Sequence, residues 1–193
     1  MYATDIEKIK QSLENVLTVI DPAYVETLLA LHKRLAKERI EWAVGGELGE
    51  ALRAVTVQPD CIEILTSKKG VAQIFLAAQE LDAEGLFFQT QRLPRDALVG
   101  GKEYPVYVRS YYFEFTLNKI KIKVHGDLQY RISNWEWGDK LEFTPEHVYV
   151  VGTKTAVVPL QFKYELYQQL GWADRADKIS RVLSRRSASI NRW

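Results

Sequence analysis

Hydrophobic and polar positions alternate in the middle of the chain, over residues 105–124. A period of two predicts β-strands with one apolar face each. The alternation pauses at Asn118-Lys119, which suits a two-residue turn. Pairing through that turn places Glu114 opposite Lys123, and opposite charges across strands are stabilising. The pattern therefore predicts an antiparallel hairpin, with the further pairs Leu117 and Ile120, Phe115 and Ile122, Phe113 and Val124, and Thr116 and Lys121.

On both sides of this hairpin, apolar residues recur at the spacing of helices. Asp21-Pro22 is typical of an N-cap followed by a proline at the first helical position. Gly85 and Gly171 stand where C-cap glycines are expected. The predicted helices are residues 4–20, 22–37, 67–85, 160–170 and 174–183. The polar and basic residues 184–193 are expected to fray.

Residues 42–65 combine both patterns: WAV predicts a short buried strand, Gly45-Gly46 a turn, residues 47–55 a helix and CIEIL a second apolar strand. Strand, helix, strand and helix in this order are typical of an α/β protein. Further short strands are predicted at residues 86–90, 147–151 and 155–158, and a loop at residues 91–103. We therefore expect an α/β (α+β) fold, a mixed sheet flanked by helices.

The composition excludes several classes of partner and of site. The chain of 193 residues has a net charge near +1, so it gives no general attraction to nucleic acid or to membranes. No apolar run approaches the roughly 20 residues of a membrane span. The N-terminal residues have no apolar core of signal-peptide type, so we expect a cytoplasmic protein. The single cysteine, Cys61, excludes an intramolecular disulfide and a cysteine-based zinc cluster.

The segment WAVGGELGEALRAVTVQPDCIEILT resembles the core of the DNA polymerase β-like nucleotidyltransferases. In that family a glycine turn opens a helix, and two carboxylates on the next strand hold magnesium against a nucleoside triphosphate. The C-terminal PLQFKYELYQQLGWADRADKI is similar to the closing helices of minor and abortive-infection-type members. The resemblance implies a nucleotidyltransferase-like mixed sheet with a helical N-terminus and a helical C-terminus.

The same resemblance implies a degenerate active site. The carboxylate pair falls on Cys61 and Glu63, and a thiol is a poor magnesium ligand. Asp60 is adjacent but reaches the same face only if a bulge beside Pro59 re-aims it. The metal ligands, if any, and the catalytic residues would therefore be Glu63 and Asp60.

Three further positions carry the implied nucleotide site. The glycine turn, Gly45 and Gly46, is followed by Glu47 where the family has a serine that contacts phosphate. The third family carboxylate, in the stretch IKVHGDL, falls on Lys123. This lysine either replaces the charge of a cation beside Glu63 or forms a surface pair with Glu114. Asp127 is a possible substitute acid or a turn residue.

These residues lead to a nucleotidyltransferase-like protein that lacks the full carboxylate set and acts by binding a nucleotide or a partner protein. Two alternatives stay open: an active enzyme that uses Mg²⁺ to transfer a nucleoside monophosphate to protein or RNA, and a subunit of a toxin–antitoxin-like complex. We expect a nucleoside triphosphate ligand, or a protein partner or homodimer through the N-terminal helices, and no nucleic acid or membrane. The predicted units are a helical pair at residues 1–40, a core at 41–158 and C-terminal helices and tail at 159–193.

One aromatic cluster has two interpretations. Trp135, Trp137 and Tyr149, together with Arg131, could stack a nucleic-acid base or cover an edge of the sheet.

Overall fold

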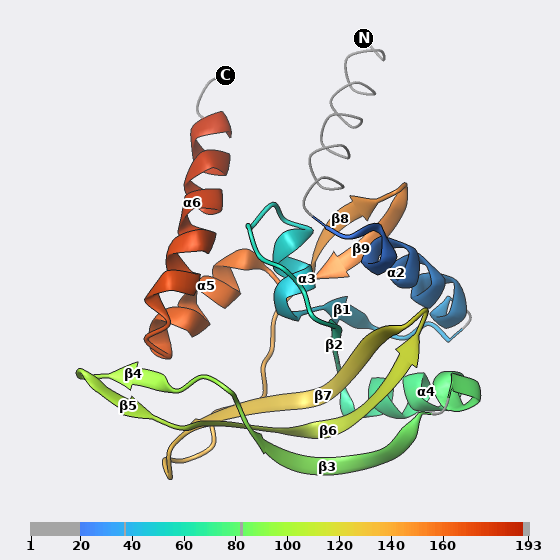
Figure 1. Cartoon of the computed structure of the whole chain (residues 1–193), viewed down its shortest axis with the longest axis horizontal. Helices are drawn as coiled ribbons and strands as arrows, with labels where there is room; N and C mark the ends of the chain where they lie inside the picture. Colours follow the sequence, from blue (N-terminus) through green and yellow to red (C-terminus); the bar gives the residue numbers. More distant parts are fainter. Residues whose placement is uncertain (1–19, 37, 82, 191–193) are drawn as a thin grey trace.

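The computed structural model describes residues 20–190, apart from residues 37 and 82. A mixed sheet forms the centre of this part of the chain, with helices packed against it (Figure 1). This arrangement confirms the predicted fold class. The helix expected at residues 4–20 lies almost wholly outside the described residues.

Seven strands form the main sheet, in the order β3-β6-β7-β2-β1-β9-β8, and β4 pairs with β5. The strands are β1 (Trp42–Val44), β2 (Ile62–Thr66), β3 (Glu84–Arg92), β4 (Ala97–Val99), β5 (Lys102–Tyr104), β6 (Val106–Leu117), β7 (Ile120–Ile132), β8 (Glu146–Val150) and β9 (Thr153–Val157). The helices are α2 (Pro22–Leu35), α3 (Gly46–Ala51), α4 (Lys68–Ala78), α5 (Leu160–Gln169) and α6 (Ala173–Ile190), with a 3₁₀ turn at Gln79–Leu81.

The β6–β7 hairpin confirms the register predicted from alternation. All five predicted pairs occur, from Leu117 with Ile120 to Phe113 with Val124. The turn residues Asn118 and Lys119 have positive φ of 51° and 67°, as a two-residue hairpin turn of the I′ type requires. The ion pair on this surface joins Glu114 to Lys121 at 3.3 Å.

Parallel pairing builds the centre of the sheet. β2 runs parallel to β7, and β1 pairs in parallel with β9. Because paired residues of adjacent strands share a face of the sheet, Glu63 and Lys123 point to the same side. The β6–β7 hairpin and the Gly45-Gly46 turn after β1 are thereby brought to one site.

Apolar packing covers the two faces of the sheet differently. On one face, α4 packs against β6 and β7 through Ile74 and Phe113, with α2 continuing the same core through Leu28. A second core joins α5 and α6 to the β4–β5 hairpin and contains Leu160, Trp172 and Ile179. The C-terminal helices are therefore held over the sheet by a core of their own.

Several predicted boundaries were wrong. Gly85 does not cap a helix: α4 ends in the 3₁₀ turn, and Gly85 belongs to β3, whose pairing with β6 overrides the continued apolar spacing. The expected loop at residues 91–103 contains the β4–β5 hairpin, in which Gly100 and Gly101 take positive φ. The helix expected at 47–55 ends at Ala51, because Ala54 has a φ of 66°. The frayed tail is instead helical as far as Ile190.

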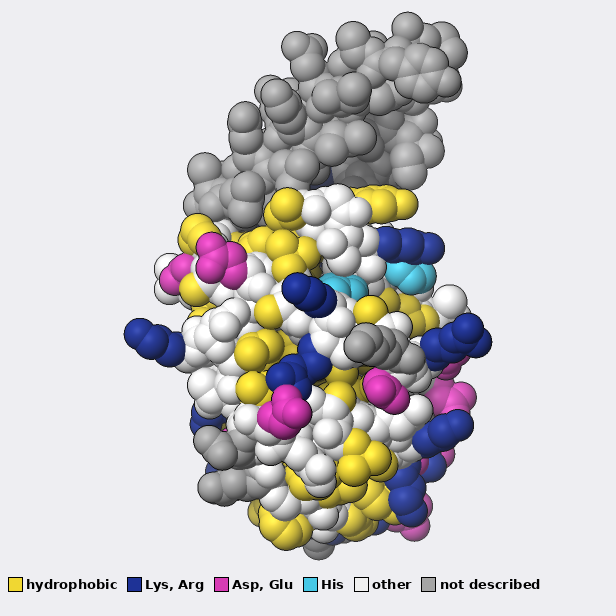
Figure 2. Space-filling model, turned by 90° about the vertical axis from the view of Figure 1, so that its right-hand side faces the viewer, with side chains coloured by type: hydrophobic (Ala, Val, Ile, Leu, Met, Phe, Trp, Pro, Cys, Tyr) yellow, Lys and Arg dark blue, Asp and Glu magenta, His cyan; other side chains and the backbone are white. Residues whose placement is uncertain are grey.

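Charge is dispersed on the side of the molecule that carries α2 and α4. Figure 2 shows hydrophobic side chains interspersed there with separate lysines and arginines. Within the described residues, no helix is both long enough and apolar enough to cross a bilayer.

Candidate functional site

A cavity of about 450 Å³ lies between the sheet and the C-terminal helices. Side chains from the glycine turn, β2, β7, α5 and α6 line it. All of the predicted site residues are among them: Gly45, Gly46, Glu47, Asp60, Glu63 and Lys123. The structure thus brings to one place residues that are up to 78 positions apart in the sequence.

The glycine turn is shaped by its contact with Glu63. The amide of Gly45 donates a hydrogen bond to the carbonyl oxygen of Glu63 at 2.8 Å. Gly46 has a φ of 52°, and a Cβ added there would lie 2.8 Å from the Glu63 carboxyl carbon. Only glycine meets both conditions without strain. The turn therefore seats the Glu63 carboxyl group against the start of α3.

Glu63 is surrounded by lysines as well as by acids. Burial raises the pKa of its carboxyl group, and the charges of Lys163 and Lys123 oppose that effect, while Asp60 and Glu47 add to it. The pKa of Lys123 is raised in turn: burial favours the neutral amine, but the carboxylates of Glu63, Asp60 and Glu114 favour the cation. Lys123 lines the cavity and lies beside Glu63, whereas the ion pair of Glu114 is formed with Lys121.

Asp60 lines the cavity. It precedes β2, which begins at Ile62, so the alternation of side chains along that strand does not determine which way Asp60 points. Cys61 is buried, and burial raises the pKa of its thiol to about 12, so the thiol stays protonated at neutral pH. Asp127 has a φ of 52° and accepts a hydrogen bond from Lys140 at 2.7 Å, away from the cavity.

This donor set does not fit a two-magnesium centre. Magnesium prefers carboxylate oxygens, and lysine cations next to them repel it. Among the described residues, no group of three or more aspartate, glutamate, histidine or cysteine side chains is placed to hold a metal ion.

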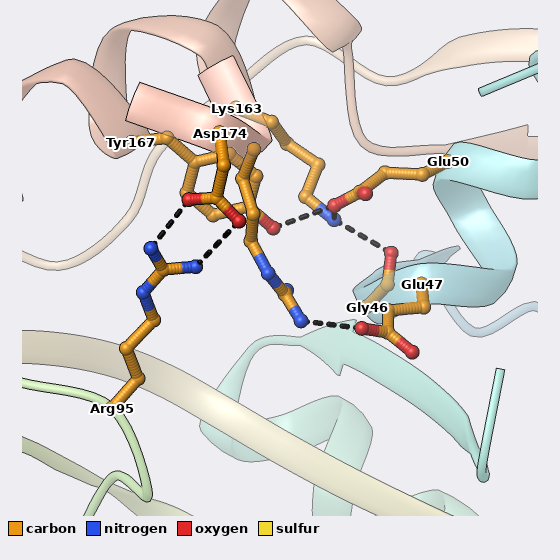
Figure 3. Close-up of polar contacts among 8 residues, drawn as sticks. Gly46, Glu47, Glu50, Arg95, Lys163, Tyr167 and Asp174 are labelled. Carbon is orange, nitrogen blue, oxygen red and sulfur yellow. Dashed lines mark hydrogen bonds and ion pairs between the residues drawn. The ribbon is translucent and has the colours of Figure 1, made fainter. Parts of the chain in front are cut away.

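Sequence reasoning missed the contribution of Lys163. Its ammonium group forms a buried ion pair with Glu50 and donates a hydrogen bond to the carbonyl oxygen of Gly46 at 2.6 Å (Figure 3). The hydroxyl of Tyr167 donates to the same carboxylate at 2.5 Å. The available signal was the helical spacing of Leu160, Lys163 and Tyr167, which puts a lysine on the buried face of α5.

Arg175 was missed as well. Its guanidinium group pairs with Glu47, so the carboxylate that follows the glycine turn is already engaged. Arg95 forms a two-pronged ion pair with Asp174, and Figure 3 shows these two side chains facing each other. The C-terminal helices therefore supply cations to the cavity.

His125 lines the cavity and also a second hollow beside it, which contains Trp42, Asp127 and Lys140. Its Nδ1 lies 3.0 Å from the hydroxyl oxygen of Ser110, and the ring is buried. Burial, reinforced by the charge of Lys123, lowers the pKa of the imidazole to about 4. His125 is therefore neutral at physiological pH and adds no charge to the site.

The lining as a whole carries more cations than carboxylates. Its cationic side chains are Arg92, Arg95, Lys123, Lys163 and Arg175, and its carboxylates are Glu47, Asp60 and Glu63. An excess of positive charge in a concave site attracts anions.

No protein-family model matches the chain, and no curated protein matches it. Solved structures do match. A proposed nucleotidyltransferase from Thermotoga maritima is 24% identical, with a TM-score of 0.61 over 86% of this chain and 96% of that one. The antibiotic-resistance factor ANT(2″)-Ia, solved with adenylyl-2″-tobramycin, is 5% identical over 86% of this chain and 93% of its own, with a TM-score of 0.48. The first of these similarities shows that the chain has a nucleotidyltransferase-like fold.

Proposed function

We propose that the protein binds a nucleotide in this cavity with lysine and arginine side chains in place of the usual metal ions. The observation that carries the proposal is the register of β2 and β7, which sets Lys123 directly beside Glu63. In the resembled family, both of these positions hold magnesium ligands. Here one of them is a cation.

The charges of the cavity support an anionic ligand. The charges of Lys163 and Lys123 act on Glu63, and Arg175 forms an ion pair with Glu47, so these cations reduce the repulsion that the carboxylates would exert on phosphate groups. Arginine and lysine both bind phosphate oxygens, arginine through two N–H groups at once. A cavity of about 450 Å³ is within the size range of small-molecule sites.

One observation favours a second candidate, the metal-dependent transferase. Asp60 and Glu63 both line the cavity, so two carboxylates meet there after all. Under this alternative, binding of nucleotide would require a divalent metal and would depend on Asp60.

Thermal unfolding with each nucleoside triphosphate, in EDTA and in Mg²⁺, separates these functions. We expect stabilisation in EDTA, because a ligand that binds only the folded state at one hundred times its Kd adds about 2.7 kcal/mol. Lys123→Met should abolish this stabilisation. The matched control is Lys121→Met, which removes a lysine from the same face of β7 outside the cavity.

Two results would contradict the proposal. Stabilisation that needs Mg²⁺ and is lost in Asp60→Asn would indicate the metal-dependent transferase. Absence of any shift with all four nucleotides would exclude a nucleotide site and leave a protein partner as the function to test.

A further inference from the structure

The face of the sheet opposite the cavity is only partly covered. In Figure 1, α4 lies at one end of β6 and β7, and the β4–β5 hairpin lies at the other. Between them, side chains of β3, β6 and β7 lie outside the two buried cores, and Trp137 from the segment after β7 packs on two of them. We call this surface the open face, and its residues are Lys68, Phe88, Tyr107, Arg109, Tyr111, Arg131 and Trp137.

The strand register determines which side chains belong to this face. Along β6, Tyr107, Arg109 and Tyr111 alternate with buried residues and continue the row that α4 covers at Phe113. Phe88 of β3 pairs with Tyr111 and therefore shares its side of the sheet. The neighbouring Phe87 pairs with Tyr112 and points to the opposite side.

Each cation of the open face lies over an aromatic ring. The ammonium group of Lys68 is 4.6 Å from the centre of the Tyr111 ring. The guanidinium group of Arg109 is 4.5 Å from the centre of Trp137, and that of Arg131 is 4.7 Å from the same ring. These contacts hold the cations in place on the surface, as cation–π contacts do.

These three cations lack acidic partners. Arg92 pairs with Asp96 and Lys140 with Asp127, but Lys68, Arg109 and Arg131 form no ion pair with a carboxylate in the part of the chain that the structure describes. The three side chains give this surface positive charge, although the whole chain has a net charge of only +1, and the nearby Asp127, which accepts a hydrogen bond from the Lys68 amide, is already paired with Lys140. The natural complement of this surface is a ligand with several negative charges.

An exposed ring completes the surface. Phe88 is 56% exposed, and its ring centre lies 5.0 Å from that of Tyr111. Several nucleic-acid-binding modules use a sheet surface of this kind, on which bases stack on the rings and phosphates contact the cations.

We propose that the open face binds single-stranded nucleic acid, with Lys68, Arg109 and Arg131 on the phosphates and a base stacked on Phe88. This surface is separate from the cavity and goes beyond the proposed function. The net charge of the chain predicts no nucleic-acid partner. The cations of the open face come together only in the folded sheet, so the sequence does not reveal them as a group. Of the aromatic cluster singled out in the sequence, Trp137 and Arg131 belong to this face, whereas Tyr149 lies on β8 at the far edge of the sheet.

Fluorescence anisotropy with labelled oligouridylate and oligothymidylate tests the proposal. The Phe88→Ala variant should bind about tenfold more weakly or worse, which is the usual effect of losing one stacked base. The matched control is Phe87→Ala, since Phe87 is 60% exposed on the other side of the same strand and should leave binding unchanged.

The salt dependence tests the phosphate contacts. Three contacts predict a slope of about −2 in a plot of the logarithm of the association constant against the logarithm of salt concentration. Arg109→Gln should make that slope shallower by about 0.7. Thermal unfolding of each variant checks that it is folded.

Three outcomes would overturn the proposal: no binding by the unaltered protein at low salt, an equal loss in Phe87→Ala and Phe88→Ala, or equally tight binding of polyglutamate. The last would show a surface for acidic proteins instead. Loss of oligonucleotide binding with nucleotide-dependent stabilisation intact would leave the cavity proposal standing.

Discussion

The carboxyl group of Glu63 lies against the α-carbon of Gly46, so close that a methyl group there would come within 2.8 Å of the carboxyl carbon. Gly46→Ala should therefore lower the free energy of unfolding twice over. The positive φ costs about 1–2 kcal/mol, and the crowding of Glu63 adds about 1–3 kcal/mol. Urea denaturation measures the sum.

The control for this change is Gly152→Ala. Gly152 has a φ of 78° with no atom within 4 Å of an added Cβ, so this variant should show only the backbone cost. Equal losses in the two variants would mean that Glu63 moves away without cost.

Lys163→Met should be among the most destabilising single changes in the chain. It leaves the carboxylate of Glu50, which is 1% exposed, without its ionic partner. Removing one member of a buried pair typically costs about 3–5 kcal/mol. Chemical denaturation should show that the double variant Lys163→Met, Glu50→Gln recovers part of the loss. Arg95→Ala breaks a comparable but exposed pair with Asp174 and should cost less than about 1 kcal/mol.

The stability of the protein should fall between pH 6.5 and pH 4 because of His125. Its pKa in the folded protein is about 4, below the ordinary 6.5, so the unfolded chain takes up the proton first as the pH falls. The difference between the two pKa values corresponds to a decrease of about 3 kcal/mol in the free energy of unfolding as the pH falls from 6.5 to 4. Above pH 6.5, His125 does not lower the stability. Denaturation at a series of pH values should show a flatter profile for His125→Asn.

His147→Asn serves as the comparison for that profile, since His147 is an exposed residue of β8. A profile of His125→Asn that is parallel to that of the unaltered protein would contradict the buried, neutral state of His125.

Lys119→Gly should stabilise the protein by about 0.5–1 kcal/mol. Lys119 has a φ of 67° at the second position of the β6–β7 turn, where glycine is the preferred residue. The thermal midpoint measures the gain. An unchanged or lower midpoint would show that the entropy of the unfolded chain outweighs the relief of strain.

The parts of the fold that sequence predicts well are those with local rules. The β6–β7 register follows from alternation and one turn, and the Gly45-Gly46 turn follows from two glycines between a strand and a helix. The β4–β5 hairpin escaped prediction because strands of three residues carry too little alternation to be recognised. The division of the chain into units at residues 40 and 158 stays a prediction.

The candidate site divides in the same way. Its sequence-adjacent half, from Gly45 to Glu63, was predicted as a unit. Lys163 and Arg175 were not, because their partners Gly46 and Glu47 lie 117 and 128 positions away, and no local pattern encodes a contact over such a distance. Only the docking of α5 and α6 on the sheet creates it.

The contact of Lys163 with Gly46 also orders events during synthesis. A ribosome adds about 5–20 residues per second, so the 117 residues between them represent roughly 6–23 s of translation. During that interval Glu50 remains hydrated and the glycine turn has no lysine above it. The cavity is therefore completed last, by helices that leave the ribosome after every strand of the sheet.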